Sequence, residues 1–140
     1  MVMTNVGMEH RHPIRVYYED TDAGGVVYYS NYLRFAERAR TEFLRNAGFN
    51  HIALMTERSL VFAVRRCEVD YFRPARLDDA LQIFTRGLKT TGASFWLEQL
   101  VKREGATLVG IKIQLVCLNG NGRPVRLPEN LRLALNLKIP

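Results

Sequence analysis

The sequence predicts a single α+β domain, residues 1–140, in which an antiparallel β-sheet wraps around one long helix. Three observations carry this prediction. A chain of 140 residues can bury a sizeable core without a metal or a disulfide. One segment has the apolar period of a helix, and four later segments read as strands separated by short turns. The helix must bury its apolar stripe, and the sheet is the only large surface available to it.

The first elements are a short strand and the long helix. A flexible tail over about residues 1–12 precedes the strand, which is predicted over residues 13–18. The helix is indicated by apolar residues spaced 3, 1, 3, 4, 1 and 3 apart, namely Tyr32, Phe35, Ala36, Ala39, Phe43, Leu44 and Ala47. Ser30 or Asn31 is placed to cap its start, and Gly48 to end it.

Four strands follow the helix. A connection over residues 50–58 leads to β-forming segments at residues 60–72, 81–88, 93–102 and 108–118, and a C-terminal helix or tail covers about residues 129–140. Consecutive strands joined by tight turns pair antiparallel. The outer face and the edge of the sheet remain to be covered, so we expect a homo-oligomer, either a dimer or a homotetramer built as a dimer of dimers.

The net charge of +6 suits an anionic partner, such as nucleic acid, anionic lipid or a phosphorylated small molecule. The basic residues are scattered, which argues against a nucleic-acid binder.

No apolar run approaches the roughly 20 residues that span a bilayer, and the N-terminus is not typical of a signal peptide, so no membrane insertion and a cytoplasmic location are expected. Cys67 and Cys117 are predicted as buried thiols. No metal site is expected, since His10 and His12 lack a third ligand.

The segment richest in chemical groups lies just before the helix. Glu19, Asp20 and Asp22 precede Gly24 and Gly25. The N–H groups at a helix start favour negative charge, and glycines let a ligand approach the backbone closely. Acyl transfer needs a nucleophile or an activated water together with an oxyanion donor, and this segment can present both kinds of group to one small volume. An acidic turn that only caps the helix is the alternative that the spacing leaves open.

This segment resembles the signature of the 4-hydroxybenzoyl-CoA thioesterase family, and is most similar to its branch of acyl-CoA thioesterases associated with the bacterial Tol-Pal system. The matched positions are Tyr18, Asp20, Thr21, Asp22, Gly24, Val26, Val27, Tyr28, Asn31 and Tyr32, then Phe35, Glu37, Ala39, Arg40, Asp70, Tyr71, Pro74, Ala75, Leu77, Asp78 and Asp79. The similarity covers roughly residues 13–128. It implies the hotdog fold and the hydrolysis of acyl-CoA thioesters to a free acid and coenzyme A, with no cofactor.

The resemblance also implies roles for individual residues. Asp22 is the expected catalytic carboxylate, as nucleophile or as general base, and the backbone N–H of Tyr29 is the expected polariser of the thioester carbonyl. Tyr29 stands where the Tol-Pal-associated branch usually has His, whereas the 4-hydroxybenzoyl branch accepts Tyr there. The expected substrate-binding residues are Gly24, Gly25, Val26, Val27, Tyr28 and Asn31.

Two carboxylates near Asp22 have open roles. Asp20 is predicted to orient the turn by accepting backbone N–H bonds, with a second catalytic carboxylate as the alternative. Glu37 is predicted to pair with Arg38 or Arg40, with a contact near the active site as the alternative.

Other classes of function compete with hydrolysis. The second hypothesis is a non-catalytic module that binds acyl-CoA or acyl-carrier protein in the groove where the substrate would otherwise be hydrolysed. Acyl-carrier protein is a candidate partner in either case. A nucleic-acid binder is a third hypothesis, and the intact run Asp-Thr-Asp-x-Gly-Gly counts against it.

Overall fold

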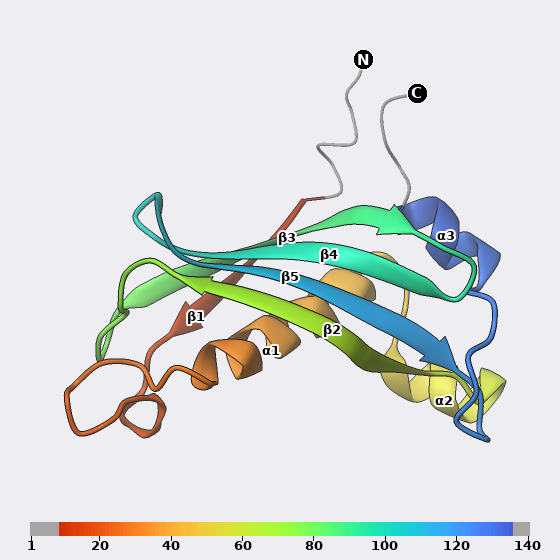
Figure 1. Ribbon diagram of the computed structural model, residues 1–140, viewed down its shortest axis with the longest axis horizontal. Helices are drawn as coiled ribbons and strands as arrows, with labels where there is room; N and C mark the ends of the chain where they lie inside the picture. Colours follow the sequence, from red (N-terminus) through yellow and green to blue (C-terminus); the bar gives the residue numbers. More distant parts are fainter. Residues whose placement is uncertain (1–8, 136–140) are drawn as a thin grey trace, which may run out of the picture.

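The computed structural model describes residues 9–135 and shows one five-stranded antiparallel sheet arched over a long helix (Figure 1). The elements are β1 (His10–Arg15), the short 3-10 helix η2 (Tyr18–Asp20), α1 (Asn31–Asn46), α2 (His51–Arg58), β2 (Val61–Tyr71), β3 (Ala80–Thr90), β4 (Ser94–Arg103), β5 (Ala106–Leu118) and α3 (Glu129–Leu135). The strand order is β1-β3-β4-β5-β2. The predicted α+β architecture, a sheet around one central helix, is therefore confirmed.

The long helix α1 buries the apolar stripe that its sequence predicts. Phe35, Ala36 and Ala39 are fully buried, and Gly48 follows the helix with a φ of +96°, a conformation that glycine adopts without strain. The predicted cap is only partly correct. Ser30 occupies the capping position, but its side chain makes no capping hydrogen bond. The N–H groups at the start of α1 are thus not satisfied by a serine hydroxyl.

The ends of the chain differ from the prediction. The first strand begins at His10 and ends at Arg15, so residues 10–12 lie in β1 and not in a tail. They pair with residues 83–85 of β3, and Pro13 is tolerated because β1 is an edge strand. The rest of the predicted tail, residues 1–8, lies outside the described residues. The expected C-terminal helix is α3, and residues 136–140 also lie outside the described part.

The predicted connection over residues 50–58 is wrong, because most of it is the helix α2. The side chain of Asn50 caps this helix by accepting hydrogen bonds from the N–H groups of Ile52 (2.8 Å) and Ala53 (3.1 Å). Ser59 ends the helix in the left-handed region, with φ of 54°. Eight residues give too few turns for an apolar period to stand out, so the asparagine cap was the only local signal.

The strand β2 lies at an edge of the sheet. It pairs with β5 alone, because the segment over residues 72–79 carries the chain across the sheet to β3 instead of forming a tight hairpin. Several apolar side chains on and just after this strand are exposed, namely Val61, Val64, Tyr71 and Phe72. Cys67 is also exposed, which corrects the prediction of a buried thiol, whereas Cys117 in β5 is fully buried as predicted.

A buried polar network joins α1 to the sheet. Gln99 of β4 is fully buried, and its Oε1 accepts a hydrogen bond from Nη1 of Arg40 at 3.2 Å. Its Nε2 donates to the carbonyl of Ala36 (2.9 Å) and to Oγ1 of Thr85 (3.0 Å). Burial lowers the pKa of the Arg40 guanidinium, and the nearby Glu37 opposes that shift. Glu37 forms no ion pair with a described residue, so its predicted pairing with Arg38 or Arg40 is not found.

We predict that Gln99→Leu destabilises the fold. The substitution leaves Arg40, Thr85 and the Ala36 carbonyl without their shared partner inside the core. Each buried group left unsatisfied costs about 1–3 kcal/mol, so the free energy of unfolding in urea should fall by about 3 kcal/mol. The matched control is Gln82→Leu on the exposed face of β3, which should change it by less than about 0.5 kcal/mol. Equal losses for the two variants would contradict a structural role for the network.

Candidate functional site

A tight hairpin precedes α1 and carries the predicted site residues. Thr21 bridges to Val27, and the N–H of Tyr28 donates to the carbonyl of Asp20 at 2.9 Å. The hairpin is fixed to the body of the protein because the N–H of Val27 donates to the carbonyl of Ala75 at 2.9 Å. The loop is therefore a defined structural unit with residues 22–26 at its tip.

Asp22 lies at this tip with an exposed side chain. Its Oδ1 accepts a hydrogen bond from the N–H of Gly24 at 2.8 Å, and its carbonyl accepts one from the N–H of Gly25 at 3.0 Å. Gly25 has a φ of +81°, where a side chain would be strained. No group among residues 9–135 donates to the second carboxylate oxygen, Oδ2. The backbone thus orients the carboxylate and leaves one oxygen open to a ligand.

Asp20 and Asn31 connect the hairpin to the start of α1. Asp20 is only 5% exposed, and its carboxylate accepts hydrogen bonds from the N–H of Tyr17 (2.8 Å) and from Nδ2 of Asn31 (2.6 Å). These contacts agree with the predicted role of Asp20 in orienting the turn. Asn31 is one of the predicted substrate-binding residues, and in the structure its Nδ2 holds the hairpin to the helix through Asp20.

The start of α1 offers unpaired backbone donors. The N–H groups of Tyr29 and Ser30 have no acceptor within the described part of the chain. The next N–H, that of Asn31, donates to the carbonyl of Tyr28 at 2.8 Å. Unpaired donors at a helix start attract negative charge. The N–H of Tyr29, which the resemblance implies as the carbonyl polariser, is therefore open, although no hydrogen bond joins Asp22 to Tyr29.

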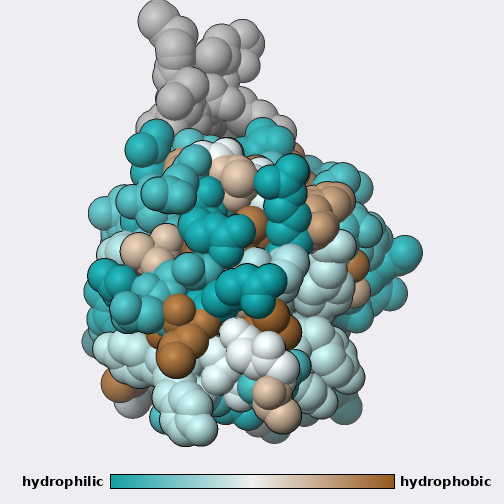
Figure 2. All heavy atoms as spheres, turned by 90° about the vertical axis from the view of Figure 1, so that its left-hand side faces the viewer, coloured by the Kyte–Doolittle hydropathy of each residue, from teal (hydrophilic) through white to brown (hydrophobic). Residues whose placement is uncertain are grey.

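An aromatic hollow of about 270 Å³ lies beside Tyr29. It is lined by Val27, Tyr29, Tyr32, Tyr71, Phe72, Arg73 and Pro74. The ring of Tyr28 contacts that of Tyr29, with centroids 4.9 Å apart, and both are exposed. Figure 2 faces the end of the molecule that carries this loop, where small apolar patches lie between strongly hydrophilic side chains.

Tyr71 lies in the aromatic hollow beside Tyr29, a placement that the sequence does not reveal. It lies at the end of β2, 42 positions from Tyr29, and its hydroxyl donates to the Tyr29 carbonyl at 3.0 Å. Residues 70 and 71 belong to the resemblance, but nothing in their spacing points to this contact. Phe72 and Arg73, which follow it in the same hollow, are missed for the same reason.

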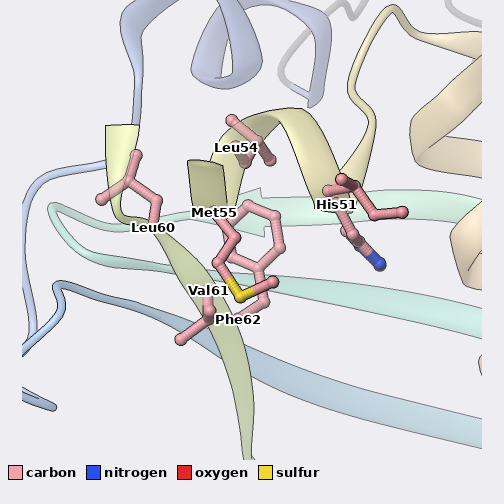
Figure 3. Close-up of a pocket in the computed structure, with 7 residues that line it drawn as sticks. His51, Leu54, Met55, Leu60, Val61 and Phe62 are labelled. Carbon is pink, nitrogen blue, oxygen red and sulfur yellow. The ribbon is translucent and has the colours of Figure 1, made fainter. Parts of the chain in front are cut away.

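Two more hollows follow the free edge of β2. One, of about 240 Å³, lies at the middle of the strand and is lined by Leu33, Arg34, Glu37, Arg40, Val64, Cys67 and Ile113. The other, of about 200 Å³, lies between α2 and the start of β2 and is lined by His51, Ile52, Leu54, Met55, Leu60, Val61 and Phe62 (Figure 3). Partial burial lowers the pKa of His51 there, and Arg40 and Arg45 lower it further. Hollows thus lie near the start, the middle and the end of the unpaired edge strand.

Residues 9–135 contain no group of three or more His, Cys, Asp or Glu side chains arranged to hold a metal ion. In the same range, no helix has the length and apolar character needed to cross a membrane.

The sequence matches known thioesterases. The profile of the thioesterase-like superfamily matches residues 16–135. The chain is 42% identical over 125 residues to the acyl-CoA thioesterase YbgC of Haemophilus influenzae, which covers 89% of this chain and 92% of the relative. It is 46% identical over 123 residues to the acyl-CoA thioester hydrolase YbgC of Escherichia coli O6:H1, with 86% of this chain and 91% of the relative covered.

A solved structure is similar over most of the chain. The crystal structure of a probable thioesterase from Bartonella henselae superimposes with a TM-score of 0.83 at 43% identity, covering 86% of this chain and 99% of that one. Together with the sequence matches, it confirms the predicted resemblance and the hotdog fold.

We predict that Asn31→Ala loosens the hairpin. The substitution removes the side-chain donor to the buried carboxylate of Asp20, which should lower the free energy of unfolding by about 1–2 kcal/mol in thermal denaturation. The control is Asn46→Ala at the exposed end of the same helix, which should have little effect. If Asn31→Ala were as stable as the control, the Asp20 contact would have no stabilising role.

Proposed function

Because the chain belongs to the thioesterase-like superfamily, we propose that it hydrolyses acyl-CoA thioesters to a free acid and coenzyme A. Relatives named as an acyl-CoA thioesterase and an acyl-CoA thioester hydrolase, at 42% and 46% identity over most of their length, support this proposal. One observation carries the proposal. The hairpin presents an open carboxylate oxygen on Asp22, and the start of the adjoining helix α1 presents unpaired N–H groups.

The proposed reaction begins with the thioester carbonyl at the start of α1. The N–H of Tyr29 donates to the carbonyl oxygen and stabilises the negative charge that develops there. In one route, Asp22 accepts a proton from a water molecule that adds to the carbonyl carbon. In the other, Oδ2 of Asp22 attacks the carbon itself and water then cleaves the mixed anhydride. In both routes the carbon–sulfur bond breaks and coenzyme A leaves as a thiolate.

The remaining predicted site residues support this arrangement in different ways. Gly24 and Gly25 shape the turn that orients Asp22, and Val27 with Tyr29 forms part of the aromatic hollow. Arg73 lines the same hollow, and we propose it as a contact for a coenzyme A phosphate, because a guanidinium binds phosphate oxygens well.

We predict that Asp22→Asn abolishes most of the activity. An amide keeps the size of the side chain but neither attacks a thioester nor accepts a proton from water. The kcat for thiol release from a panel of acyl-CoAs should fall by at least about 100-fold, with the unfolding midpoint unchanged. The matched control is Glu19→Gln, an exposed carboxylate in the same loop, which should keep near-normal kcat.

Each competing function gives a different result in these assays. Saturable binding of acyl-CoA or acyl-carrier protein by the wild type, with no thiol release above background, would favour a non-catalytic binding module. Retention on DNA with a steep salt dependence would favour nucleic-acid binding. Near-normal turnover of Asp22→Asn would remove Asp22 from the mechanism.

We also propose that the free edge of β2 pairs with β2 of a second copy. An unpaired edge strand with exposed apolar side chains, here Val61 and Val64, is a template for pairing with another strand. A two-fold axis makes the two strands antiparallel, so the start of β2 in one copy lies opposite its end in the other. The hollow beside α2 (Figure 3) then approaches the aromatic hollow of the second copy. This arrangement supports a site built from two copies.

We predict that Val64→Asp weakens this assembly. A buried carboxylate at the edge would oppose pairing, so light scattering should show a shift towards the single-chain mass of 16.1 kDa. The control is Leu133→Asp on α3, where an exposed apolar residue lies away from the edge. An unchanged mass for Val64→Asp, or the same shift for both variants, would rule out the β2 edge as the interface.

A further inference from the structure

A single hydrogen bond links the sheet to the backbone of Tyr29. The hydroxyl of Tyr71, at the end of β2, donates to the Tyr29 carbonyl at 3.0 Å. The neighbouring contacts come from the hairpin, where Asp20 bonds to the N–H of Tyr28 and to the side chain of Asn31. Asp20 therefore holds the two ends of the segment over residues 28–31, and Tyr71 holds its middle.

Tyr71 contacts two neighbouring aromatic rings, one of which is buried. Its ring packs edge-on against Tyr29, with centroids 6.4 Å apart, and against Tyr32, at 5.8 Å. Tyr32 is only 3% exposed, and its hydroxyl accepts a hydrogen bond from the N–H of Ala75 at 2.9 Å. The buried ring of Tyr32 thus anchors the ring whose hydroxyl donates to the Tyr29 carbonyl.

The planarity of the peptide bond carries this constraint to the donors. The carbonyl of Tyr29 and the N–H of Ser30 belong to one peptide plane and point in opposite directions. Fixing the carbonyl therefore fixes the Ser30 N–H and restricts rotation about the Tyr29 Cα, which carries the other unpaired N–H. A donor held in position before the reaction needs no reorganisation when negative charge develops on the substrate.

Stability alone does not account for this contact. Tyr29 is 62% exposed and Tyr71 is 47% exposed, so water can satisfy both groups when the bond is broken. A hydrogen bond between two groups that water can also satisfy adds little to the stability of the fold. Partial burial raises the pKa of the Tyr71 hydroxyl, and Cys67, Tyr29 and Tyr32 raise it further, so the group stays protonated and keeps donating.

We propose that Tyr71 is a positioning residue of the active site, which holds the Tyr29–Ser30 peptide so that the N–H groups at the start of α1 face the thioester carbonyl. Tyr71 acts through the backbone of Tyr29 and does not touch the reacting atoms. This inference rests on the proposed thioesterase activity.

The test is Tyr71→Phe in the full-length protein, which removes the hydroxyl and keeps the ring contacts. The N–H donors remain but are less well oriented, so kcat for thiol release should fall about 10-fold, less than the roughly 100-fold typical of a deleted donor. KM should change by less than about twofold, because the substrate contacts are unchanged. The matched control is Tyr18→Phe, which removes an exposed hydroxyl with no hydrogen-bond partner among the described residues and should leave kcat unchanged.

A second readout does not depend on activity. Nitrogen-15 relaxation should show lower order at residues 29 and 30 in Tyr71→Phe than in the wild type, with no change along β2. An unchanged kcat, a loss confined to KM, or unchanged order at residues 29 and 30 would overturn the inference. If the wild type released no thiol, the proposed function would fall, and the role of Tyr71 in holding the backbone would be decided by relaxation alone.

Discussion

The burial of α1 under the sheet determines where every other part of the site lies. Phe35, Ala36 and Ala39 have no exposed surface, and the contact between Gln99 and Arg40 ties the helix to β4. A helix packed along its whole stripe cannot slide or tilt without opening the core. Its first residues therefore stay beside the end of β2, where the aromatic hollow forms. The packing of α1 and the contact from Tyr71 together hold the open donors at Tyr29 and Ser30 in position.

Local patterns made most of the fold predictable. The long helix has an apolar period of 3.6, and the turns around Gly92, Gly105 and residues 119–122 separate segments rich in β-forming residues, so their strands could be placed to within a few residues. The neighbour of β2 could not be predicted, because pairing with β5 depends on how residues 72–79 cross the sheet. The helix α2 was missed because its length offers few periodic positions, although the Asn50 cap was visible.

The site was predictable only where it is local. Asp22, Gly24 and Gly25 lie within four positions of one another, and the turn that they form is the one that their residue types favour. Ser30 fails as a side-chain cap because its backbone, at φ −77° and ψ −13°, is already helical, whereas a capping side chain needs extended backbone. Tyr71 lies beside Tyr29 because of the strand order in the sheet, which cannot be predicted from any short stretch of the sequence.

Because Tyr71 lies on an edge strand, the ordering of the Tyr29 backbone is linked to the pairing of two copies through β2. One strand carries both the hydroxyl that orders Tyr29 and the free backbone edge that we propose as the contact with a second copy. Pairing would restrain the end of β2 and so restrain Tyr71. By mass action, the fraction of chains with an ordered donor would then grow with protein concentration. Turnover per chain would rise with concentration until pairing saturates, and dilution alone would act as a reversible inhibitor.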